Sequence, residues 1–189
     1  MRIVLASSSP RRKELLEKLE IPFEIITKDT EEIFDSNKNI YDASMEVAKK
    51  KAEAVYSEIS GDIIVIGGDT IVNYHNRVIG KPKNLEEAYN MIKDFSGNTH
   101  EVISSLCLLI RKDGKEYIEL TFDKSIVKVA DLTDEEINDW INNHDVLTRA
   151  GAYAIQDGFG KYIEYIEGDY FSIVGLPLHK LYNLLKKYK

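Results

Sequence analysis

The sequence has almost no cysteine and no long apolar run, and each absence excludes a class of protein. Its 189 residues include one cysteine, Cys107, so the chain can form neither an intramolecular disulfide nor a zinc site built from several cysteines. No apolar stretch approaches the ~20 residues that span a bilayer as a helix, and the first residues do not follow the pattern of a secretory leader. We therefore expect an unprocessed cytoplasmic protein without a membrane partner.

Positive charge is also in short supply. The formal net charge is −7 at pH 7, so no general basic field is available to attract nucleic acid, and a nucleic-acid-binding domain is disfavoured. Any site for an anionic ligand must be built locally from a few cations. No repeat, linker or low-complexity segment divides the chain, and we expect residues 1–189 to form a single domain.

Hydroxyl and guanidinium groups gather near the start of the chain, directly after an apolar run. Residues 3–6 predict a short buried strand, and Ser9 with Pro10 then predicts a helix start, with the serine as N-cap. Such a start presents unpaired backbone N–H groups and a partial positive charge, and Arg11 and Arg12 follow on its first turn. These are the donors that a polyphosphate needs, although a capped helix with solvated arginines fits the residues equally well.

A long second helix is predicted from Asp42, which we expect to cap it. Lys49 and Lys51 lie on the two flanks of its apolar stripe, so either could reach over a cleft, whereas most lysines in that position extend to water. The stripe consists of six residues at helical spacing: Met45, Ala48, Ala52, Val55, Tyr56 and Ile59.

A carboxylate and a hydroxyl follow a strand of the predicted core. Residues 63–66 form the β-branched run that is typical of a central strand. We expect that strand to end at Gly67-Gly68, where a loop would present Asp69 and Thr70 to a ligand. The alternative is an aspartate that only satisfies a tight turn.

Further polar candidates lie before and after this strand. The acidic connection at 28–39 contains Glu31 and Glu32, one of which could face a metal held by phosphates, although most such loops are simply solvated. Pro82 forces an extended conformation on Lys81, which keeps this lysine outside any helix. His100 has no neighbours at metal-ligand spacing and is expected to be a hydrogen-bonded residue at a strand start.

The last candidate follows a run of small residues. Residues 150–156 are interpreted as a strand with room beside it for a flat ligand. Gln156 at its end could read the edge of a base through its paired donor and acceptor, although a strand-end glutamine is usually solvated.

Six segments, taken together and in this order, resemble the Maf family of nucleoside triphosphate pyrophosphatases. The pattern at 152–156 is similar to the branch that hydrolyses dTTP and UTP. The resemblance implies an α/β fold like that of inosine triphosphatase, with a mixed β-sheet, flanking helices and a deep nucleotide-binding cleft between two lobes, and members often form homodimers. The segments are Ser7-Ser8-Ser9-Pro10-Arg11-Arg12, Gly68-Asp69-Thr70, Gly80-Lys81-Pro82, Ser96-Gly97-Asn98-Thr99-His100, Gly151-Ala152-Tyr153-Ala154-Ile155-Gln156 and Val174-Gly175-Leu176-Pro177-Leu178.

The resemblance also implies roles for individual residues. It places the proton acceptor at Asp69, selects Lys51 over Lys49 because an alanine follows Lys51, and makes Asp69 and Glu32 metal ligands for Mg²⁺ or Mn²⁺. Asp157 departs from the family pattern, which usually has glycine there. The other implied positions are Lys81 for catalysis, Ser8 for substrate binding, and Arg12, Thr70 and Gln156 for discrimination between substrates.

The reaction implied is hydrolysis between the α and β phosphates of dTTP or UTP, which removes excess or non-standard nucleotides as monophosphate and pyrophosphate. The alternative is a nucleotide-binding regulator of cell division or septum formation that turns over slowly.

Overall fold

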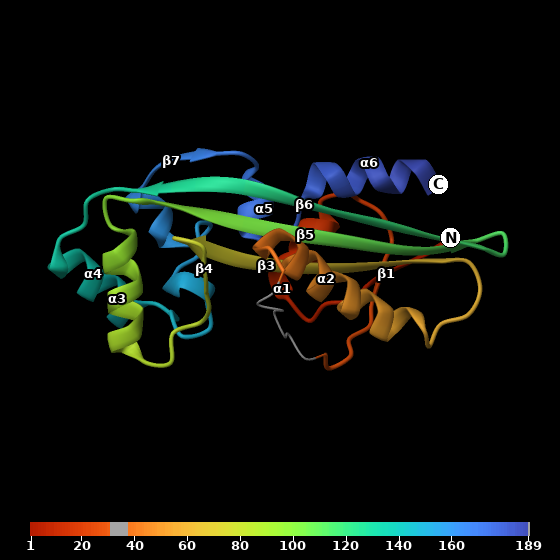
Figure 1. The fold of residues 1–189 in the computed structure, drawn as a ribbon, viewed down its shortest axis with the longest axis horizontal. Helices are drawn as coiled ribbons and strands as arrows, with labels where there is room; N and C mark the ends of the chain where they lie inside the picture. Colours follow the sequence, from red (N-terminus) through yellow and green to blue (C-terminus); the bar gives the residue numbers. More distant parts are fainter. Residues whose placement is uncertain (31–37, 189) are drawn as a thin grey trace. The chain divides into compact units, whose positions relative to one another are not determined.

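The computed structural model describes residues 1–30 and 38–188 (Figure 1). The chain divides into two compact units. The first unit is Met1–Thr70, Ser104–Asp123 and Gly175–Lys189, and the second unit is Ile71–Ile103 and Lys124–Val174. Within the described ranges, no helix is long and apolar enough to cross a membrane.

A mixed sheet forms the framework, as predicted. In the described part of the chain it has seven strands in the order β2-β1-β3-β5-β6-β7, with β4 paired to β3. β1 pairs in parallel with β2 and β3, whereas β3 with β4 and β6 with β7 are antiparallel. The strands are β1 (Arg2–Leu5), β2 (Glu24–Ile25), β3 (Ile63–Tyr74), β4 (Arg77–Ile79), β5 (Thr99–Lys112), β6 (Lys115–Val129) and β7 (Ile163–Glu167).

Helices flank this sheet in both units. Ser9 caps the first of them, as predicted, and its side chain accepts a hydrogen bond from the backbone N–H of Arg12. The first unit carries α1 (Pro10–Glu17), α2 (Ile40–Tyr56) and α6 (Leu178–Tyr188). The second unit carries α3 (Leu85–Phe95), α4 (Asp134–Asn143), α5 (Tyr170–Val174) and the 3₁₀ helices η1 (Ala150–Ala152) and η2 (Gly158–Tyr162).

Helix α2 begins earlier than predicted. Asn39 is its N-cap and accepts a hydrogen bond from the backbone N–H of Asp42, so the prediction that Asp42 caps the helix is wrong. The additional turn is favoured because Tyr41 stacks on Phe122 of β6, with ring centroids 5.0 Å apart. Of the predicted stripe, Ala48, Ala52 and Val55 are buried, and the rest of the buried face is formed by Ala43, Ser44 and Val47.

The core of the first unit lies where α2 packs on β1, β3 and β5. Strand β3 continues through Gly67 and Gly68 to Tyr74, so the predicted loop at these glycines is wrong. Gly67 lies so close to α2 that an added Cβ would collide with the carbonyl oxygen of Ala48. The absence of a side chain at Gly67 thus serves close packing of a helix on a strand rather than a turn. Cys107 is fully buried in the same core.

The second unit has its own core, formed mainly by α3, α4 and the segment after α4. Residues 150–156 do not form the predicted strand. Gly151 and Ala152 have φ angles of 69° and 62°, and the Ala152 carbonyl accepts a hydrogen bond from the Trp140 indole. Gly151 N–H donates to the carbonyl of Gly80. These backbone groups are therefore bonded to a side chain and a neighbouring loop, which removes them from any strand ladder.

Candidate functional site

Asp69 and Lys51 form a buried ion pair in the first unit. Asp69 is in the middle of β3, and its Oδ1 accepts a hydrogen bond from Lys51 Nζ at 2.9 Å. The side chains are 6% and 13% exposed respectively. Lys49 instead pairs with Glu53 one turn further along the outer side of α2. The structure thus brings Lys51 to the predicted proton acceptor and directs Lys49 elsewhere.

Two serines complete the surroundings of this carboxylate. Ser44 of α2 donates from Oγ to Asp69 Oδ2 at 3.4 Å, and Ser105 of β5 donates to Ser44 Oγ at 2.8 Å. The sequence interpretation missed both serines. A signal was available for Ser44, because it precedes Lys51 by seven residues and therefore lies on the same side of α2 two turns away.

Arg12 and Thr70 form a second cluster. Arg12 Nη2 donates to Thr70 Oγ1 at 3.2 Å and its Nε donates to the Gly175 carbonyl at 3.0 Å. Thr70 Oγ1 also shares a hydrogen bond of 2.8 Å with Ser104 Oγ. Because successive residues of a strand face opposite sides, Asp69 and Thr70 present their side chains to different faces of β3.

The predicted Ser8 is exposed, and its neighbour Ser7 makes the contact with Arg12. Ser7 is buried, accepts a hydrogen bond from Arg12 Nη1 at 3.3 Å, and accepts another from the Ser9 backbone N–H at 3.2 Å. The family resemblance selected Ser8 from the three serines, whereas the contact with Arg12 is made by Ser7. Both serines follow β1, which ends at Leu5, so no strand periodicity distinguishes them in the sequence.

Two further predicted site residues belong to the other unit, and one lies outside the described residues. Lys81 and Gln156 belong to the second unit, and both are exposed. Asp157, the residue that departs from the family pattern, forms an ion pair with Arg149 at 2.7 Å. Glu32 lies outside the described residues, so its predicted role as a metal ligand stays a prediction.

The donor set of the site fits a metal that is bound jointly with substrate. In the described ranges, no group of three or more histidine, cysteine, aspartate or glutamate side chains could hold an ion by itself. Mg²⁺ usually binds one or two carboxylates together with substrate phosphates and water. The buried carboxylate of Asp69 could supply one ligand of that type.

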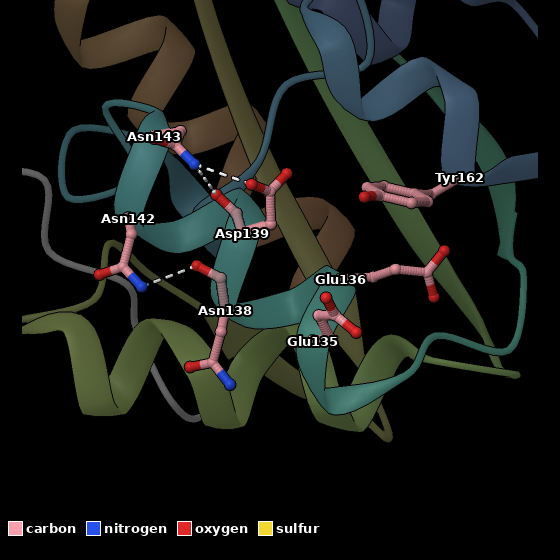
Figure 2. A pocket seen from close by; sticks show the side chains of 7 residues that line it. All are labelled: Glu135, Glu136, Asn138, Asp139, Asn142, Asn143 and Tyr162. Atoms are coloured by element: carbon pink, nitrogen blue, oxygen red, sulfur yellow. Dashed lines mark hydrogen bonds between the residues drawn. The ribbon is translucent and has the colours of Figure 1, made fainter.

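A hollow elsewhere in the second unit lacks the chemistry of a polyphosphate site. It measures about 690 Å³ and is lined by Tyr162 and the polar side of α4. Figure 2 shows that the amide of Asn142 points to the carbonyl of Asn138, and that of Asn143 to Asp139, so these donors are used within the helix. The lining contains acidic side chains and no lysine or arginine.

Comparison with known proteins gives a match over nearly the whole chain. The family model described as "Maf-like protein" matches residues 2–188. A dTTP/UTP pyrophosphatase of Lachnoclostridium phytofermentans is 44% identical over 189 residues, covering 98% of this chain and 94% of that protein. Another from Alkaliphilus oremlandii is 42% identical over 186 residues, covering 98% and 95% of the two chains.

Among solved structures, the Staphylococcus aureus Ham1 protein gives a TM-score of 0.46 at 14% identity, covering 69% of this chain and 73% of that chain. This more distant likeness adds nothing to the assignment, which depends on the sequence matches. Because the family model spans residues 2–188 and close relatives align along nearly their whole length, the chain belongs to the Maf family.

Proposed function

We propose that this chain hydrolyses dTTP and UTP to the nucleoside monophosphate and pyrophosphate. The observation that carries the proposal is the buried Asp69–Lys51 pair, which joins a proton acceptor to a cation in the core of the first unit. The names of the relatives, dTTP/UTP pyrophosphatase, supply the substrate class. The described residues offer no observation in favour of a slow regulator of cell division.

The residues divide the reaction between them. A water oxygen attacks the α phosphorus, and the bond from that phosphorus to the oxygen bridging to the β phosphate breaks. Pyrophosphate leaves with the electron pair of the broken bond, while the proton from water passes to the Asp69 carboxylate. Lys51 is a fixed positive group beside Asp69 and stabilises the charge that grows on the phosphates.

The amino end of α1 supports the same chemistry. Its first backbone N–H groups and the partial positive charge of the helix end favour phosphate oxygens. Three nitrogens of Arg12 donate hydrogen bonds to Ser7, Thr70 and Gly175, and these bonds restrict the movement of the guanidinium group. A guanidinium fixed in this way discriminates by shape as well as by charge.

A divalent cation is part of the proposal. Asp69 would hold Mg²⁺ or Mn²⁺ together with substrate phosphates, and the resemblance adds Glu32 from outside the described residues. The bound ion would neutralise phosphate charge during bond breaking.

The other implied residues complete the proposed assignment. Lys81 would bind phosphate, Ser8 would donate to substrate through its hydroxyl, and Gln156 would read the N–H and carbonyl edge of uracil or thymine. A homodimer in the cytoplasm, acting on excess or non-standard nucleotides, is proposed from the family resemblance.

The test is release of pyrophosphate by the purified protein with Mg²⁺ or Mn²⁺, measured for all common nucleoside triphosphates. We expect UTP and dTTP to be hydrolysed fastest. Asp69→Asn should lower turnover by about two to four orders of magnitude and leave nucleotide binding nearly intact, since the amide keeps the size and loses the basicity of the carboxylate. Tight binding of triphosphates without pyrophosphate release would reject the enzyme. Equal loss of binding and turnover in the variant would make Asp69 chiefly a ligand.

A further inference from the structure

A buried chain of hydroxyl groups ends on the carboxylate of Asp69. Ser105 Oγ donates to Ser44 Oγ at 2.8 Å, and Ser44 Oγ donates to Asp69 Oδ2 at 3.4 Å. Ser44, Ser105 and Asp69 are 0%, 1% and 4% exposed. The three residues come from α2, β5 and β3, so the chain of hydrogen bonds connects three elements within the first unit.

The direction of the hydrogen bonds in this chain is set by chemistry. A serine hydroxyl has one hydrogen to donate. Because Ser44 accepts from Ser105, its own hydrogen is directed to Asp69, where the carboxylate can only accept. Asp69 Oδ1 is held separately by Lys51 at 2.9 Å. Both oxygens of the carboxylate are therefore bound from α2, by residues two helical turns apart.

We propose that Ser44, oriented by Ser105, is a positioning residue that fixes the rotation of the Asp69 carboxylate about its Cβ–Cγ bond. The role rests on the proposed function of Asp69 as the proton acceptor. The Ser44–Asp69 contact is longer than the ~2.5–2.7 Å of a strong hydroxyl–carboxylate bond. Contacts of catalytic groups commonly tighten when substrate binds, and this one is expected to do so.

Two variants separate positioning from simple support of the fold. Ser44→Ala leaves the buried Ser105 hydroxyl without its acceptor, which destabilises the protein whichever role Ser44 has. The double variant Ser44→Ala/Ser105→Ala removes both hydroxyls, so it should recover part of the lost stability. We expect kcat for UTP to be about tenfold lower in both variants, the low end of the effect of losing a hydrogen bond to a charged group. KM should stay within about twofold.

Ser125→Ala is the matched control. Ser125 is fully buried in the second unit and exchanges hydrogen bonds with the backbone of Asp169, so its loss also removes a buried hydroxyl pairing. This control should lower the melting temperature and leave kcat unchanged. Recovery of kcat together with stability in the Ser44/Ser105 double variant would overturn the proposal, because activity would then follow folding alone.

A readout without catalysis completes the experiment. Crystal structures of the wild type and the double variant should show the Asp69 carboxylate rotated in the variant. An unrotated carboxylate would overturn the positioning role even if kcat fell. If the wild type releases no pyrophosphate from any triphosphate, the proposed function fails, and the crystallographic comparison still decides whether Ser44 positions Asp69.

Discussion

Two lysines of α2 provide a direct test of which residue serves the site. Lys51 binds Asp69 in the interior, whereas Lys49 binds Glu53 with both side chains substantially exposed. Lys51→Met should lower kcat/KM by about two to three orders of magnitude, since it removes a fixed charge beside the reacting groups. Lys49→Met makes the same lysine-to-methionine change at an exposed ion pair, and such pairs contribute little. Its kcat/KM should therefore stay within about twofold of the wild-type value.

The measurement is steady-state hydrolysis of UTP, with circular dichroism to confirm that both lysine variants fold. Equal losses in the two variants would mean that α2 contributes only general positive charge. A larger loss in Lys49→Met would reassign the catalytic lysine.

Selectivity between bases is predicted to depend on Gln156. Its amide offers one donor and one acceptor, which matches the ring N–H and carbonyl groups of uracil and thymine. Gln156→Ala should reduce the preference for UTP over CTP and GTP by at least about tenfold, because the variant loses the hydrogen bonds that only a matching base edge can form. An unchanged ratio of specificity constants across the three substrates would remove the physical basis for assigning the chain to the pyrimidine branch.

At the level of elements, the packing of α2 on β3 controls where Lys51 and Ser44 lie relative to Asp69. Gly67→Ala would place a methyl group against the Ala48 carbonyl, so the helix that carries Ser44 and Lys51 must move. We expect a loss of at least about 2 kcal/mol in the free energy of unfolding, together with a lower kcat.

Gly80→Ala is the control for stability, because within the described residues no atom other than those of Gly80 and its chain neighbours lies within 4 Å of a Cβ built on Gly80. The free energies of unfolding of the two glycine variants and the wild type are measured by denaturant unfolding and compared. Similar stabilities would show that α2 can shift away from β3 at negligible cost.

The contact between β5 and the segment after α4 is predicted to make stability depend on pH. His100 is buried and shares a hydrogen bond of 2.6 Å with the Tyr153 hydroxyl, and burial lowers the pKa of His100 to about 4. The unfolded chain binds a proton near the ordinary pKa of 6.5, so between these values it takes up more protons than the folded chain. The stabilising contribution is therefore complete above pH 6.5 and is lost as pH falls through about 4.

Unfolding by denaturant at pH 7.5 and 4.5 measures this effect. The difference between the free energies of unfolding at the two pH values should be roughly 2–3 kcal/mol smaller in His100→Gln than in the wild type. His179→Gln, at an exposed histidine of α6, should leave the pH dependence as it is. The same pH dependence in all three proteins would assign it to other groups.

The elements that sequence reasoning located correctly were those whose signals are local. Ser9 with Pro10 fixes a helix start through contacts within one turn, and this cap is present. The wrong predictions depended on partners distant in the sequence. Gly67 allows α2 to approach, and residues 150–156 bond to Trp140 and Gly80, so neither conformation follows from local propensity.

At the level of the whole molecule, family membership was predictable because six short motifs keep their order along the chain, and the mixed sheet followed from it. The pairs Lys51–Asp69 and Arg12–Thr70 were predicted as members of one site. Ser105 could not be identified, since a serine gives no periodic signal and its role depends on which acceptor the fold brings to it. The single domain stays a prediction.

The lone thiol of the chain allows the opening of its core to be measured without an added label. Cys107 is in the centre of β5, and burial raises its pKa to about 12, so the native protein keeps the group both covered and protonated. Thiol reagents attack the thiolate, hence reaction requires the surrounding core to separate first. The rate at which a chromogenic disulfide modifies Cys107 therefore reports how often the core of the first unit opens enough to expose the thiol. In the Gly67→Ala variant the modification rate should rise by the same factor as the equilibrium constant for opening of the core. Cys107 is therefore an internal probe of the packing of α2.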